Sequence, residues 1–152
     1  MIRNEKEYIE AMRRIKEDQC VIEQQRAALE SRGYAPQDVE YGMGPLLSFH
    51  AQLVEEVEWY ERVRRRDIQP ISDLTALGQL LIAARIALGL SQAELASRLG
   101  VSEAQVSRDE RNEYRGISTD RAQRIFDAMG IRTVTRVEWN QILTDAKDLV
   151  TA

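Results

Sequence analysis

The feature that most constrains this fold is a stretch reading SQAELASRLGVSEAQVSRDERN. Ser91 is followed three residues later by Glu94, and Ser102 is followed at the same spacing by Gln105. This is the spacing of a capping box, in which a hydroxyl accepts from free backbone amides at the start of a helix. Gly100 lies between the two signals, where a helix commonly ends in a left-handed residue. The stretch therefore predicts two short helices joined by a tight turn.

Helices are also predicted on both sides of this stretch. Before it, apolar residues recur at spacings of three and four and end at Gly89, which indicates an amphipathic helix: Leu74, Leu77, Leu81, Ala84 and Leu88. After a loop at 113–117, Ser118 or Thr119 can cap a further helix that ends at Gly130. Its inner face is formed by Ala122, Ile125, Phe126 and Met129.

Together these residues carry a family resemblance. Residues 74–130 resemble the lambda-repressor-like, or Cro/XRE, helix-turn-helix domains. The motif residues are Arg85, Gly89-Leu90-Ser91-Gln92, Glu94-Leu95-Ala96, Leu99-Gly100-Val101-Ser102, Val106-Ser107 and Glu110. The resemblance implies a helical bundle that places its second motif helix in the major groove of a double-stranded DNA operator. It also implies that Gln92 touches a phosphate and that Arg85 and Glu110 form a structural pair rather than a specificity contact.

The resemblance assigns base contacts to the early, outward positions of the second motif helix, namely Glu103, Ala104, Ser107 and Arg108. Arg108 is the strongest candidate, because bidentate arginine to guanine is the commonest specific contact. Ala104 can touch a thymine methyl, and Glu103 either accepts from cytosine or favours the helix N-terminus by its charge. The loop that follows offers phosphate ligands at Asn112, Tyr114 and Arg115.

Charge does not favour indiscriminate DNA binding, since the chain has a net charge of -4. Asp109 stands where the family usually has an apolar or aromatic residue, and with Glu110 it lowers the local positive field. The loop at 112–117 also departs from the family's usual short turn. A local arginine cluster nevertheless suffices for a sequence-specific binder. Its expected members are Arg98, Arg108, Arg111, Arg115, Arg121 and Arg124.

Three units are predicted: a helical hairpin over 1–70, a helix-turn-helix domain over 71–131 and a C-terminal extension over 132–152. The first helix of the hairpin carries a heptad-like seam of Tyr8, Met12, Ile15, Gln19, Ile22, Arg26 and Leu29. Glycines and prolines predict a break from Gly33 to Pro45, and a second helix from about Pro45 to Arg66. Its predicted inner face is Leu46, Phe49, Leu53, Val57, Tyr60 and Val63.

The hairpin weakly resembles the leading helices of HigA-type antitoxins. The likeness rests on Glu7-Tyr8 through Arg14-Ile15 and on Leu53-Val54 through Tyr60-Glu61. It implies an autorepressing antitoxin with a protein toxin as partner. The alternatives are a hairpin that only dimerises or stiffens the protein, and a chain that acts mainly as a protein-binding antitoxin or scaffold through these helices.

The extension combines two patterns. Residues 133–137 are β-branched except for Arg136 and are typical of a short strand. An amphipathic helix is predicted after them from Trp139, Ile142, Leu143, Ala146 and Leu149 or Val150. Such a helix can cover its own core or pair with a second copy. Pairing favours a homodimer that reads two half-sites about one turn of DNA (34–36 Å) apart.

No catalytic site, metal site or cofactor is predicted. Cys20 is the only cysteine and His50 the only histidine, and no phosphate-binding loop is present. No apolar run approaches a membrane span, so no membrane partner and a cytoplasmic location are expected. The sequence thus predicts an all-α, sequence-specific transcription regulator, most simply a repressor, and not an enzyme.

Overall fold

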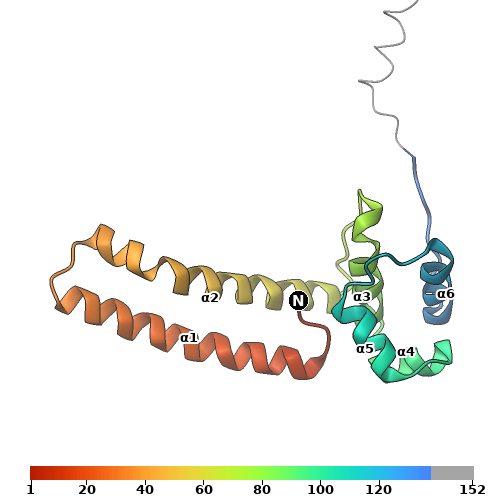
Figure 1. Ribbon diagram of the computed structural model, residues 1–152, viewed down its shortest axis with the longest axis horizontal. Coiled ribbons are helices and arrows are strands. Elements are labelled where there is room, and N and C mark those ends of the chain that lie inside the picture. The colour runs from red at the N-terminus through yellow and green to blue at the C-terminus, as the bar shows by residue number, and fades with distance from the viewer. Residues whose placement is uncertain (138–152) are drawn as a thin grey trace, which may run out of the picture.

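The computed structural model describes residues 1–137, and these residues are helical with no strand among them, which confirms the all-α prediction. Two long helices form an antiparallel hairpin, and four shorter α-helices lie at its open end (Figure 1). In chain order the elements are α1 (Glu5–Ser31), α2 (Pro36–Arg64), a 3-10 turn η1 (Leu74–Ala76), α3 (Leu77–Ala87), α4 (Gln92–Leu99), α5 (Glu103–Arg111) and α6 (Thr119–Met129).

The ends of α4 and α5 follow their local capping signals. Ser91 and Glu94 form a complete capping box at α4, in which each side chain bonds the other residue's backbone N–H. Ser102 caps α5 by accepting from the Gln105 amide at 3.2 Å. The side chain of Gln105 donates instead to Asp109, at 3.1 Å. The second box is therefore only half formed, because Asp109 one turn later is the stronger acceptor.

The turn of the hairpin is shorter than predicted. The break includes Gly33 as expected, but its predicted end at Pro45 is wrong, because α2 begins at Pro36, which takes the first helical position. There its missing N–H costs nothing and its fixed φ suits the helix. Pro45 lies inside α2 and is exposed. Val39 and Met43, on the N-terminal side of Pro45, are fully buried, so packing in the hairpin holds this segment helical despite the proline.

The packed face of α2 is largely the predicted one. Val57, Tyr60 and Val63 are buried, and Leu53 packs against them. Phe49 was expected on this face but is 71 % exposed. At 100° per residue, eight residues place Phe49 about 80° around the helix from Val57, so it turns away from α1.

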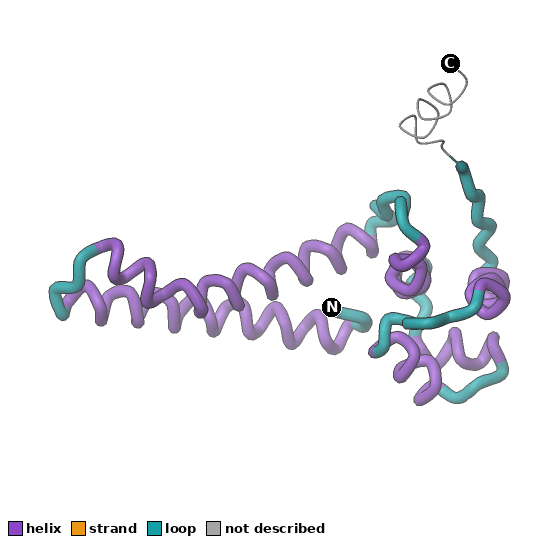
Figure 2. The backbone as a smooth tube through the Cα atoms, turned by 45° about the horizontal axis from the view of Figure 1, so that its top comes forward, coloured by secondary structure: helices purple, strands orange, loops and turns teal. Residues whose placement is uncertain are grey.

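The hydrophobic core is continuous from the hairpin into the bundle. One buried cluster contains hairpin residues and bundle residues together: Ile2, Ala11, Val57, Tyr60, Val63, Leu81, Ile82, Ala83, Ala84, Ile86, Leu95, Ala96, Val106, Tyr114, Ala122, Ile125, Phe126 and Met129. Figure 2 shows the C-terminal end of α2 running into the bundle beside α3. The division predicted between residues 70 and 71 falls in the loop between α2 and η1, and the hydrophobic core extends across it.

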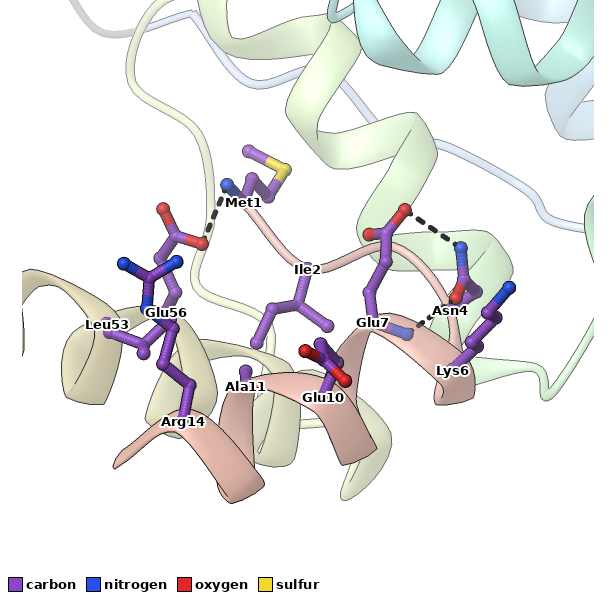
Figure 3. A pocket seen from close by; sticks show the side chains of 10 residues that line it. All are labelled: Met1, Ile2, Asn4, Lys6, Glu7, Glu10, Ala11, Arg14, Leu53 and Glu56. Carbon is purple, nitrogen blue, oxygen red and sulfur yellow. Dashed lines mark hydrogen bonds and ion pairs between the residues drawn. The ribbon is translucent and has the colours of Figure 1, made fainter. Parts of the chain in front are cut away.

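The N-terminal residues lie across the base of the hairpin (Figure 3). Ile2 is 3 % exposed, and the Met1 amino nitrogen lies 2.9 Å from Glu56 Oε2. Asn4 caps α1 by accepting from the Glu7 amide at 2.9 Å. A cavity of about 650 Å³ remains between this segment and the two helices. Among residues 1–137, this cavity is lined only by the N-terminal segment, α1 and α2, and no residue of α5 reaches it.

Residues 131–137 have no regular secondary structure, although a strand was expected over 133–137. Val134 and Val137 are exposed, and no strand among the described residues is available to pair with this segment. The helix predicted from Trp139 lies outside the described residues. Within residues 1–137 no single helix is long and apolar enough to cross a membrane. One pair of segments, η1 with α3 and then α4, reaches that length and apolar character together, but the two segments meet at a bend of 108°.

Candidate nucleic-acid interface

Helix α5 is fixed by one face and leaves the other open. Val106 and Glu110, one turn apart, are buried at 2 % and 0 % exposure and hold α5 in the bundle. Glu103, Ala104 and Arg108 are exposed, and the predicted fourth base contact, Ser107, is half-buried. The side chains predicted to read bases therefore lie on the solvent side of a helix that is held by the core.

A buried ion pair fixes α5 to α3. Arg85 Nε donates to Glu110 Oε1 at 2.5 Å, and the guanidinium also reaches Oε2 at 2.7 Å, so the contact is bidentate. The side chains are 3 % and 0 % exposed. Arg85 donates further to the backbone carbonyls of Leu90 at 2.7 Å and Arg3 at 2.8 Å. This geometry fits a structural role, because every nitrogen of the guanidinium already donates to an acceptor within the protein.

Gln92, the predicted phosphate contact, belongs to the same network. Its Nε2 donates to Glu110 Oε2 at 2.7 Å, and the residue is half-buried at the first position of α4. An amide nitrogen carries two donors, so one N–H remains for a phosphate. The sequence did not reveal the bond to Glu110, since the two residues lie on different helices.

Tyr114 was expected to bind phosphate, and the structure contradicts this. Its ring is 6 % exposed and belongs to the core. Burial raises the pKa of the phenol, and the negative charges of Glu110 and Asp109 raise it further. Glu113 and Tyr114 both have φ of 50°, and this left-handed turn directs the ring inward. Asn112 and Arg115, on either side of the turn, remain exposed.

The turn after α5 packs against a glycine that sequence reasoning did not single out. An added Cβ at Gly78 in α3 would lie 1.9 Å from the Glu113 carbonyl oxygen and 3.2 Å from Tyr114 Cβ. The backbone of α3 and the backbone of the turn therefore touch directly. A glycine within a helix is the only sequence signal of such a contact.

Asp109 connects α5 to α6. Its carboxylate accepts from Arg121 in a very short ion pair and from Gln105. Arg121 is thereby neutralised, and Arg98 donates to the Ala128 carbonyl at 3.2 Å. Two of the six arginines predicted to surround α5 thus serve packing. The other four are exposed and form no ion pair within residues 1–137: Arg108, Arg111, Arg115 and Arg124.

A groove of about 530 Å³ runs beside α5 where the hairpin meets the bundle. It is lined by Gln92 and Glu103 from the motif and by Arg3, Lys6 and Arg64 from the hairpin. No sequence pattern predicts that these parts meet, since Arg3 and Arg85 are 82 positions apart. Among the described residues no group of three histidine, cysteine, aspartate or glutamate side chains is placed to hold a metal ion.

Comparison with known proteins identifies the motif region. Residues 81–135 match the family described as Helix-turn-helix, of the Cro/C1 type. No curated protein and no solved structure matches the chain. The match confirms the lambda-repressor-like character of this region and supports a DNA-binding transcription regulator of the Cro/XRE type. It covers none of the hairpin, and the likeness of residues 1–70 to HigA-type antitoxins has no support.

Proposed function

We propose that this protein is a sequence-specific repressor that inserts α5 into the major groove of its operator. The observation that carries the proposal is the division of α5 into two faces. Val106 and Glu110 anchor it in the core, while Glu103, Ala104 and Arg108 stay exposed. A helix held by the bundle presents side chains to base edges at a fixed angle, as direct readout requires.

In this proposal Arg108 reads a guanine through its O6 and N7 acceptors. Ala104 contacts a thymine methyl, and Ser107 bonds a neighbouring base or phosphate. Glu103, at the first position of α5, accepts from a cytosine amino group. Each of these roles fits the exposure of the side chain, with Ser107 the most restricted of the four.

Phosphate contacts set the register of α5 in the groove. Gln92 uses its second amide N–H, while its first stays on Glu110. Asn112 and Arg115 are exposed after the end of α5 and reach the backbone from that side. Tyr114 is left out of this set because its ring is buried.

We further propose that two copies bind one operator. A nine-residue α5 with four outward side chains reads only a short half-site, and doubling it supplies the specificity that repression needs. The hairpin offers apolar side chains that a second copy can cover, because Tyr41 and Phe49 of α2 are 89 % and 71 % exposed. A toxin partner has no support from the comparisons and is not part of the proposal.

Selection of bound sites from a random pool of DNA duplexes tests the function. We expect enrichment of a mirrored pair of half-sites, and light scattering should give a dimer in solution. A single enriched half-site with a monomeric protein would overturn the dimer. A pool in which nothing is enriched would overturn the function.

Replacing Arg108 with alanine tests the assignment of the reading helix. We expect a loss of about 1–3 kcal/mol in binding free energy and relaxed preference at one base position. The matched control is Arg32→Ala, an exposed arginine that caps the C-terminal end of α1 in the turn of the hairpin. If both variants bound the selected duplex as the wild type does, α5 would not be the reader that we propose.

A further inference from the structure

The groove beside α5 has hairpin residues on one wall and motif residues on the other. Its volume is about 530 Å³, and its motif wall contains Gln92 and Glu103, the first residues of α4 and α5. Its hairpin wall contains Arg3, Glu5 and Lys6 at the start of α1 and Arg64 at the end of α2, so three cations and one carboxylate line it. Figure 1 shows the start of α1 next to α5, and the Arg3–Arg85 bond holds these parts together at 2.8 Å.

The groove continues the surface on which the proposed function places DNA. Gln92 and Glu103 are the proposed phosphate and base contacts at the leading ends of the two motif helices. A duplex seated on α5 runs its sugar–phosphate backbone past the start of α4. A strand that passes Gln92 in this arrangement continues toward the hairpin wall, because both line the same groove.

Lys6 is the cation that this wall leaves available. It is exposed and forms no hydrogen bond or ion pair within residues 1–137. Figure 3 shows it beside Asn4, at the end of α1 away from Leu53 and Glu56. Arg64 is engaged, because it pairs with Glu5 at 2.8 Å and lies over the Tyr60 ring. Arg3 Nε is buried without a hydrogen-bond partner among the described residues and lies 3.6 Å from Glu7 Oε2, so it is less accessible than Lys6.

We infer that this groove takes the DNA backbone outside the half-site and that Lys6 binds a phosphate there. The inference rests on the proposed function and extends it, because it makes the hairpin part of the DNA-binding surface. A free ammonium on a flexible four-carbon stem suits a phosphate contact that carries no base preference. An acidic peptide is the other ligand that a lysine attracts, but the groove shares its motif wall with the residues that face DNA.

The test compares Lys6→Gln with Lys16→Gln in the full-length protein. Lys16 is an exposed lysine on the same helix and does not line the groove, so it is a matched control. Binding is measured by fluorescence anisotropy against the selected duplex and a scrambled duplex over a range of salt concentrations. We expect Lys6→Gln to weaken both duplexes alike, by about 5- to 10-fold near 0.1 M salt, and to lower the salt slope by about 0.9.

A second measurement places the contact. The selected duplex is shortened one base pair at a time at its flank. The affinity of the wild type should fall by the same factor as in Lys6→Gln when the phosphate opposite Lys6 is removed. The affinity of Lys6→Gln should not change at that step. Lys6→Glu should weaken binding further, because it places a negative charge against the backbone.

The outcomes separate this inference from the proposed function. If Lys6→Gln matched Lys16→Gln in affinity and slope while Arg108→Ala still relaxed one base position, the groove would not be a DNA site and the repressor function would stand. If the wild type bound no duplex selectively, both would fall. An acidic peptide that bound the wild type but not Lys6→Gln, with DNA binding equal in the two, would also overturn the inference.

Discussion

Two arginine–glutamate pairs with the same shortest N–O distance differ in their exposure to solvent. Arg85–Glu110 and Arg13–Glu10 both have an N–O distance of 2.5 Å, but the side chains of the first are 3 % and 0 % exposed and those of the second 60 % and 64 %. Glu110→Ala leaves a buried guanidinium without its counter-charge, so we expect a loss of about 3–5 kcal/mol in the free energy of unfolding. Urea denaturation followed by circular dichroism measures it.

Glu10→Ala is the control for this pair, and we expect it to leave stability unchanged because solvent screens the exposed pair. Similar losses in the two variants would mean that burial does not decide the strength of the Arg85–Glu110 pair. Because Gln92 also bonds Glu110, Glu110→Ala should in addition weaken DNA binding without changing base preference.

Gly78 and Gly44 are both helical glycines, but only Gly78 touches another backbone. A methyl group at Gly78 would lie 1.9 Å from the Glu113 carbonyl oxygen, whereas nothing lies within 4 Å of one at Gly44. We expect Gly78→Ala to destabilise the protein at or above the upper end of the roughly 1–3 kcal/mol typical of overpacking. Gly44→Ala should instead stabilise by about 0.5–1 kcal/mol, because alanine is the better helix former. Thermal melts of the two variants check this, and equal melting temperatures would contradict it.

At the scale of the element, the start of α4 depends on pH through its capping box. The backbone N–H of Ser91 and then its hydroxyl donate to the Glu94 carboxylate, and both bonds lower the pKa of that carboxyl below its ordinary value. A lowered folded pKa means that this stabilisation is present above the ordinary glutamate pKa of about 4.3 and is lost as the pH falls through the folded pKa.

We therefore expect the wild type to lose more stability than Glu94→Gln when the pH is lowered from about 5 to 3. Thermal melts at each pH measure the difference. Parallel pH profiles for the two proteins would show that the capping box adds no pH dependence.

The sequence predicts elements well where the cause is local. The serines before α4, α5 and α6 and the glycines after α4 and α6 act within a few residues, so these ends were predictable. The turn of the hairpin was misplaced because Pro45 is a local signal against helix that packing overrides. Tyr114 was misplaced for the same reason, since its burial depends on a turn held against Gly78 from another element.

The candidate site divides in the same way. The exposed face of α5 follows from its helical period, so Ala104 and Arg108 were placed correctly on the solvent side. The bond from Gln92 to Glu110 and the pairing of Asp109 with Arg121 join residues on different helices. No spacing within one segment encodes such contacts, and they required the structure.

At the scale of the whole molecule, hairpin and bundle share one core and should unfold together. Ile2, Val57 and Tyr60 pack in the same buried cluster as Leu81 and Phe126. We expect a single calorimetric transition whose van't Hoff and calorimetric enthalpies agree. The control is Phe49→Ser, an exposed hairpin variant that should keep one transition. Two resolved transitions in the wild type would show that the hairpin is an independent unit.

The bond from Arg85 to the Arg3 carbonyl also orders events during synthesis. Arg3 leaves the ribosome well before the guanidinium that receives its carbonyl, which is 82 positions later, and before the counter-ion of that guanidinium, Glu110. Ile2 and Arg3 therefore stay exposed to solvent until the residues that bury them have been synthesised. Closing so long a loop is slow compared with forming a helix, so we expect the docking of Ile2 and Arg3 onto the bundle to be the last step of folding.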